Sequence, residues 1–251
     1  MFVARNRLFY LKYTIVLLCM LTLFLPCFVQ GGDVHPSDPA YQGDSYPALA
    51  NFLYRQAITD WHDWKQSGDA ALFQRALFNI DSAITIEPAR SEFYLLNGML
   101  LWEMKASPEA VEGALDAFLQ AVALNPENGR AQFMTATALF SLGRFDLAFE
   151  QWKFLLEKDP AMITGIALSQ FTLSAVGSGR QEEGEHLLQA LAEQHPDSAD
   201  IRISLATLLK SRGMTAEAKD QLVDILVEKS GSREKQDYAL SLLGQWKKEG
   251  R

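Results

Sequence analysis

Prolines recur along this chain at nearly equal intervals, and this regularity limits what the chain can fold into. They are Pro88, Pro126, Pro160 and Pro196, and the intervals between them are 38, 34 and 36 residues. Each follows a stretch with helical apolar spacing, where a proline ends the helix because it has no N–H to donate. Repetition at this period is typical of stacked helical hairpins. The sequence therefore predicts an all-α solenoid.

The stretch from 113 to 126, GALDAFLQAVALNP, shows the repeated helix most clearly. Ala114, Ala117 and Ala121 lie three and four residues apart, so they share one face of the helix. Small side chains on that face let a neighbouring helix approach closely. In every matching helix a small residue is followed four positions later by a bulky apolar one. These pairs are Ala76 and Ile80, Ala114 and Phe118, Ala148 and Trp152, Gly184 and Leu188, and Ala218 and Leu222.

This arrangement resembles the tetratricopeptide repeat (TPR) family, whose second helix carries an alanine, an aromatic residue, a further alanine and a closing proline. The best-preserved unit runs from Ala131 to Pro160 and has Gly143 at its turn. Ala136 and Ala206 replace the glycine that is usual in the family's first helix. The resemblance implies a right-handed α-solenoid of about five hairpins over residues 48–230.

Two longer helices are expected at the ends of the repeats. The opening helix, residues 48–68, contains Trp61 and Trp64, which we expect to cover the open end of the stack. A capping helix is expected within residues 231–251, because Tyr238, Leu242 and Trp246 lie four apart on one face.

The beginning of the chain indicates a targeting segment, residues 1–31. A basic start is followed by an apolar run of 17 residues from Tyr13 to Val29. This length fits both a signal peptide cleaved after Gly31 and an N-terminal membrane anchor, with membrane contact through residues 8–29 if it is uncleaved. Whether the segment is cleaved or retained, we expect the rest of the chain to be exported to the periplasm. There it would be soluble after cleavage, or anchored to the inner membrane if the segment is retained. Residues 32–47, rich in proline, glycine and aspartate, are expected to form a flexible linker.

Composition excludes several classes of function for the remainder. Both cysteines, Cys19 and Cys27, lie in the targeting segment, so the body would have no disulfide and no thiolate nucleophile. Without the leader's three basic residues the chain has 20 basic and 31 acidic residues, a net charge of −11. This balance disfavours nucleic acid as a partner. Four scattered histidines and the lack of catalytic motifs predict a non-enzymatic protein with no cofactor and no metal.

A binding surface remains as the candidate site. In the resembling family the first helix of each hairpin lines a concave groove, which predicts an apolar, aromatic groove with Arg130 and Lys210 as its cations. An error of one residue in register would instead place these side chains between the hairpins, and that alternative stays open. The predicted groove residues are Leu95, Met99, Trp102, Arg130, Phe133, Thr137, Phe140, Ser169, Leu173, Ile203, Thr207 and Lys210.

The resemblance then implies a non-catalytic scaffold that binds a peptide or protein during assembly of an envelope or secreted complex. Cytochrome c maturation is the first pathway to test, because exported family members there combine a membrane segment with a repeat domain. The alternative is a membrane-tethered structural subunit of a machine for pilus assembly, secretion or polysaccharide export. That subunit would use its convex or terminal faces, and exposure of Tyr238 and Trp246 on the capping helix would favour it.

Overall fold

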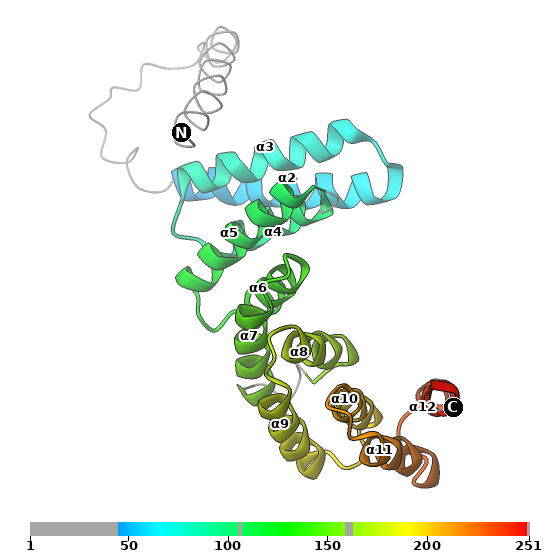
Figure 1. The fold of residues 1–251 in the computed structure, drawn as a ribbon. Helices are drawn as coiled ribbons and strands as arrows, with labels where there is room; N and C mark the ends of the chain where they lie inside the picture. Colours follow the sequence, from blue (N-terminus) through cyan, green and yellow to red (C-terminus); the bar gives the residue numbers. More distant parts are fainter. Residues whose placement is uncertain (1–44, 105–106, 159–162, 250–251) are drawn as a thin grey trace, which may run out of the picture. The chain divides into compact units, whose positions relative to one another are not determined.

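The computed structural model describes residues 45–104, 107–158 and 163–249, and within these ranges the chain is helical, without a strand. Consecutive helices pair into hairpins, α2 with α3 through α10 with α11, and α12 follows (Figure 1). The helices are α2 (Ser45–Ser67), α3 (Ala70–Ile86), α4 (Ser91–Glu103), α5 (Pro108–Leu124), α6 (Gly129–Ser141), α7 (Phe145–Lys158), α8 (Gly165–Gly177), α9 (Gln181–Gln194), α10 (Ala199–Ser211), α11 (Thr215–Val227) and α12 (Arg233–Glu249). This is the all-α solenoid of five hairpins and a last helix that the repeats predict.

The recurring prolines determine where the second helices end. Helices α3, α5 and α9 end two residues before Pro88, Pro126 and Pro196. The residue before a proline is sterically disfavoured in helical conformation, so it becomes the first one outside the helix. Asn125 shows this, because its backbone is extended, with φ −142° and ψ 91°.

Glycines with positive φ make the turns inside the hairpins. Gly143, Gly179 and Gly213 have φ values of 69°, 74° and 83°, a conformation that costs side-chain-bearing residues energy. Gly143 follows the pattern expected from the sequence.

A different glycine allows two helices to pack closely. Gly98 on α4 faces the ring of Phe118 on α5, and a Cβ atom added at Gly98 would lie 2.5 Å from a carbon of that ring. The small residues that take the same place in later hairpins, Ala136 and Ala206, are fully buried. The family's glycine can therefore become alanine in those hairpins, whereas at position 98 only glycine fits.

Within the described ranges, buried apolar residues form two clusters. The first joins α2, α3 and α4, with Trp61 and Trp64 half-buried against it. The second runs from α5 to α12 and contains Phe149 and Phe171, whose rings stack at 4.9 Å between α7 and α8. Each hairpin therefore obtains its core from its neighbours, as in other repeat proteins.

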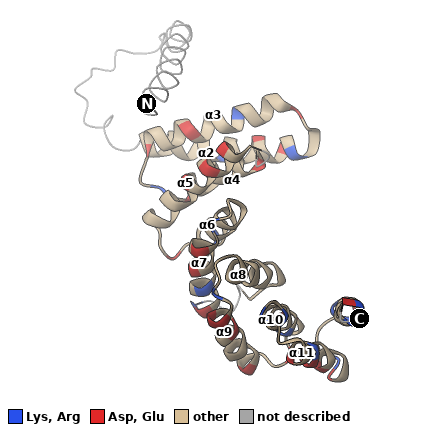
Figure 2. Cartoon of the chain, in the orientation of Figure 1, with Lys and Arg blue, Asp and Glu red and all other residues tan. Residues whose placement is uncertain are grey.

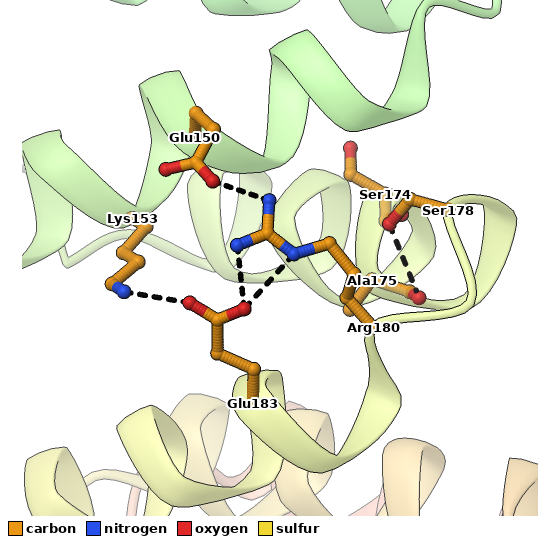
Figure 3. A network of polar contacts seen from close by, with 7 residues as sticks. All are labelled: Glu150, Lys153, Ser174, Ala175, Ser178, Arg180 and Glu183. Carbon is orange, nitrogen blue, oxygen red and sulfur yellow. Dashed lines mark hydrogen bonds and ion pairs between the residues drawn. The ribbon is translucent and has the colours of Figure 1, made fainter.

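Arginines at the turns of the α6/α7, α8/α9 and α10/α11 hairpins tie each of these three hairpins to the preceding one. Arg180 follows the turn after α8, pairs with Glu150 on α7 and with Glu183 on α9, and lies 4.1 Å from the ring centroid of Phe149. Lys153 donates to the same Glu183 at 2.7 Å, which completes the network in Figure 3. The hydrogen bond from Lys153, followed by that from Arg180, lowers the pKa of Glu183. The same link recurs from Arg144 to Glu112 and from Arg212 to Glu185.

The last helix is attached differently, because the chain has no proline after α11. Lys229 and Gly231 both have positive φ, 54° and 71°, and reverse the chain around the buried Ser230. On α12, Trp246 is only 6 % exposed, so it does not supply the exposed apolar surface that would favour the structural-subunit alternative. Tyr238, two turns earlier, is 52 % exposed. The helix thus covers the end of the core with Trp246 and leaves Tyr238 to solvent.

The predicted targeting segment, residues 1–31, lies outside the described residues, as does most of the predicted linker. Helix α2 begins at Ser45, within the range 32–47 that we expected to be linker. Among the helices of the described ranges, none is long and apolar enough to cross a bilayer.

Candidate functional site

The hollow between α8, α10 and α12 is the best-defined candidate site among the described residues. Its volume is 340 Å³, and it collects four of the predicted groove residues from two hairpins. Its lining is Gly165, Ser169, Thr172 and Leu173 from α8, Asp200, Ile203, Ser204 and Thr207 from α10, and Lys235 and Tyr238 from α12. We call it the α8/α10/α12 cavity. The first helices of consecutive hairpins contact one another here, α8 with α10 and α10 with α12.

An ion pair forms one wall of the cavity. Lys235 Nζ donates to Asp200 Oδ1 at 2.6 Å, and this hydrogen bond raises the pKa of Lys235. Gly165, at the start of α8, lies against both groups, since a Cβ atom added there would be 3.0 Å from Asp200 Oδ1 and 3.4 Å from Lys235 Nζ. The two groups have opposite charges at contact distance, so this wall of the cavity carries no net charge.

Hydroxyl groups line much of the remaining surface. Thr172 is 2 % exposed, and within the described residues its hydroxyl has no hydrogen-bond partner. Ser204 is 7 % exposed and lines the same space. Thr207 differs, because its hydroxyl donates to the carbonyl oxygen of Ile203 at 2.8 Å, inside its own helix. A buried hydroxyl without a partner is unfavourable by about 1–3 kcal/mol, so Thr172 is suited to meet a ligand group.

Two predicted aromatic groove residues pack largely inside the protein. Phe133 is half-buried and meets Trp152 edge to face, with 5.0 Å between ring centroids. Phe140 contacts Phe145 at 5.8 Å. Phe145 itself fills the space beside Gly177 of the next hairpin, where any Cβ atom would overlap its ring. Phe133 and Phe140 therefore contribute to the packing of the hairpins and expose only part of their rings to the groove.

The two predicted groove cations are in different situations. Lys210 Nζ pairs with Glu249 at 3.1 Å and lies 5.5 Å from the ring centroid of Trp246, so the last helix already holds it. Arg130, at the start of α6, is exposed, and its side chain makes no ion pair with the described residues. Of these two cations, Arg130 is thus the one available to an anionic group of a ligand.

The other predicted residues line the first helices. Leu95, Met99 and Trp102 on α4 are half-buried and pack against the second core cluster. The hydroxyl of Thr137 on α6 donates to the Phe133 carbonyl oxygen at 3.0 Å, as Thr207 does within α10.

The sequence interpretation missed part of the cavity wall because it treated the last helix only as a cap. Tyr238 lies 35 residues after Ile203, and Lys235 lies 35 after Asp200, so α12 continues the repeat period as a further first helix. Applying the period to this helix would have placed both residues on the groove. Thr172 and Ser204 carry no such signal, since their exposure to the cavity depends on packing.

The site offers binding groups and no recognisable reactive set. No group of three or more histidine, cysteine, aspartate or glutamate side chains that could hold a metal lies within the described ranges. The hydroxyls, the internal ion pair and the half-exposed apolar side chains are suited to holding a peptide segment.

The comparison with protein families agrees with this geometry. The model of the tetratricopeptide repeat family matches residues 109–160, which cover α5, α6 and α7. Residues 109–160 of this chain therefore carry tetratricopeptide repeat sequence. The repeats recognised from the sequence in that segment are confirmed, and the TPR architecture extends structurally to the hairpins on either side.

Solved structures similar to this chain include two that are described as TPR proteins. A MamA crystal structure aligns with a TM-score of 0.57 at 13 % identity, over 77 % of this chain and 94 % of that one. A tetratricopeptide repeat protein from Parabacteroides merdae aligns at 0.56 and 19 % identity, over 77 % of this chain and 74 % of that one. YrrB, described as a TPR protein with an unusual peptide-binding site, aligns at 0.53 and 20 % identity, over 79 % and 98 %. The comparison with curated protein sequences finds no match.

Proposed function

We propose that this TPR chain is a non-catalytic scaffold that binds a segment of a partner protein along its first helices. The observation that carries the proposal is the continuous surface of α6, α8, α10 and α12, which contact one another in sequence. The last three of these helices line the cavity. Such repeat surfaces bind extended or helical segments. That the structurally similar YrrB has a peptide-binding site supports the same use of the fold.

The setting that we propose is an exported body, with residues 1–31 acting as signal peptide or anchor. The basic start and apolar run of that segment support this location. Assembly of an envelope or secreted complex is then the proposed process, and cytochrome c maturation remains the first pathway to test by fold-level analogy.

Arg130 is the cation that we expect the partner to use. Its charge acts on the hydroxyl of Tyr54 on α2: burial and then Glu92 raise the Tyr54 pKa, while Arg90 and Arg130 oppose that rise. Arg90 is already paired with Glu92 and Glu87. An anionic group of a partner, such as a carboxylate, would therefore bind at Arg130.

Capture from the envelope fraction tests the scaffold. The bait is the full chain, compared with an Arg130→Ala, Phe133→Ala variant whose helicity is verified by circular dichroism. The matched control is Arg55→Ala, Phe154→Ala, which removes an exposed arginine from α2 and a half-exposed phenylalanine from α7. Loss of one captured protein with the first variant and retention with the second supports the groove. Equal capture by all three baits refutes it.

A structural subunit is the second candidate, and exposed apolar residues on the second helices favour it. Leu119 on α5, Leu147 on α7 and Phe154 on α7 are 45 %, 56 % and 45 % exposed. These side chains lie on helices that do not line the cavity. A captured protein that is lost with Leu147→Asp, Phe154→Ala and kept with the Arg130, Phe133 variant would establish this alternative.

A further inference from the structure

Helix α8 contains no charged residue and still presents a row of large apolar side chains to solvent. Its sequence from Gly165 to Gly177 is GIALSQFTLSAVG, and it is drawn without blue or red in Figure 2. Ile166, Leu173 and Val176 are 62 %, 47 % and 37 % exposed, at spacings of seven and three residues that keep them on one side. An exposed apolar stripe at this spacing is suited to pack against another helix.

The α8/α10/α12 cavity opens beside this stripe, because Leu173 belongs to both. The hydroxyl of Thr172 is buried in its wall and has no hydrogen-bond partner among the described residues, and Ser204 lines the same wall. A polar group of a ligand that enters the cavity would satisfy the Thr172 hydroxyl, and an apolar group would leave it unsatisfied.

The charges around the cavity indicate that this group is neutral. Asp200 and Lys235 are already bonded to each other at 2.6 Å, and Lys210 is held by Glu249. A carboxylate would face Asp200, and an ammonium group would face Lys235. A side chain with both donor and acceptor character, as in serine, threonine, asparagine or glutamine, meets neither repulsion.

We propose that α8 and this cavity bind an amphipathic helix of the partner through its uncharged face. Apolar side chains three or four residues apart lie over Ile166, Leu173 and Val176, and one neutral hydrogen-bonding side chain enters the cavity to bond Thr172. This inference rests on the proposed function and specifies the chemistry of the partner. Recognition here needs no free carboxyl terminus and has little dependence on salt, because no unpaired charge takes part.

A displayed library of 18-residue peptides, selected on the full chain, tests the proposal. Enriched peptides are expected to carry apolar residues at helical spacing with a serine, threonine, asparagine or glutamine between them. Amidating the carboxyl terminus should leave their affinity within twofold. Leu173→Asp should weaken binding at least tenfold, whereas Leu119→Asp, at a similarly exposed leucine on α5, should not.

The cavity itself is tested by two variants of α8. Thr172→Val replaces the unpartnered hydroxyl with a methyl group, so the fold should be as stable as before or more stable, while peptide affinity falls about five- to tenfold. Ser174→Ala is the matched control, because Ser174 also has a buried hydroxyl without a partner among the described residues but does not line the cavity. Its affinity should stay unchanged.

Three results would overturn the inference. They are enriched peptides that need a free carboxyl terminus, enriched peptides with charges on the binding face, and equal affinity of wild type and Thr172→Val. The captured native partner separates this failure from failure of the scaffold. Capture that depends on Arg130 and Phe133 but not on Leu173 or Thr172 refutes only the inference, and capture independent of all four refutes the proposed function.

Discussion

Alanine at Gly98 should destabilise this protein, although alanine normally stabilises a helix. The Cβ atom would lie 2.5 and 2.6 Å from two carbons of the Phe118 ring, whereas carbon atoms pack well at about 3.5–4.0 Å. Phe118 is fully buried, so its ring has little room to move away. Gly113 on α5 is the matched control, because a Cβ atom there would meet only Leu101 Cδ1, at 3.5 Å.

The expected magnitudes follow from two opposing terms. Replacing a helical glycine by alanine is favourable by about 1 kcal/mol. Overpacking at position 98 opposes this by about 1–3 kcal/mol, so Gly98→Ala should lower the free energy of unfolding by up to about 2 kcal/mol. Gly113→Ala keeps the favourable term and should raise it by up to about 1 kcal/mol. The two variants should thus differ by the overpacking cost, about 1–3 kcal/mol.

Urea unfolding of the full chain, followed by circular dichroism, measures this difference as a separation of about 1 M between the two midpoints. Replacing the opposing ring with the Phe118→Leu substitution should reduce the cost of Gly98→Ala, since contacting residues are energetically coupled. If Gly98→Ala is as stable as Gly113→Ala, or if its cost is unchanged in the Phe118→Leu background, the close approach of α4 and α5 does not exclude a methyl group.

Three further predictions concern polar contacts and turns. The pKa of Glu183 is lowered by Lys153 and Arg180, so the contribution of Glu183 to stability is present above pH of about 4.5 and is lost as the pH falls further. Glu183→Gln should therefore make the urea midpoint less dependent on pH in that acid range. Identical pH profiles of the wild type and the variant would refute this. Lys229→Gly relieves a positive φ of 54° and should stabilise the chain by about 0.5–1 kcal/mol in the same assay, with a loss of stability as the contrary result. Asp60 is 1 % exposed and accepts hydrogen bonds from Arg75 and Asn79, so Asp60→Ala should reduce hydrogen-exchange protection in α2 and α3 about tenfold or more while α10 and α11 keep theirs. Uniform loss along the chain would contradict this local effect.

Much of the architecture could be predicted from local sequence, because each hairpin repeats the same pattern of small, bulky apolar and helix-ending residues. The prolines and Gly143 mark where helices end and turn, and these are properties of the backbone at single residues. The period also brings Ser169, Leu173, Ile203 and Thr207 to one surface, and the structure places all four in the α8/α10/α12 cavity. The placement of the helices and of these four side chains therefore needed no tertiary information.

The state of individual side chains could not be predicted in this way. Lys210 and Arg130 looked equivalent as groove cations, yet of the two only Lys210 has an acidic partner among the described residues, Glu249, supplied by a helix beyond the recognised repeats. Tyr238 and Trp246 looked equivalent on one face of the capping helix, yet Tyr238 is 52 % exposed and Trp246 is 6 % exposed, because α12 packs across the end of the core with Trp246. Both outcomes depend on what the last helix contacts, and a helical period contains no information about that.

The sequence by itself determined the class of this protein: its helices, their ends, their period and the face that each hairpin presents. These follow from backbone sterics and from the alternation of small, bulky and polar residues within one repeat. The tertiary structure alone decided which of those side chains remain available to a partner. Three features result from contacts between hairpins. The Thr172 hydroxyl has no hydrogen bond to any described residue, Lys235 neutralises Asp200, and α8 exposes apolar side chains to solvent. A single repeat does not determine these features, because burial and charge pairing are set by neighbours about 35 residues away.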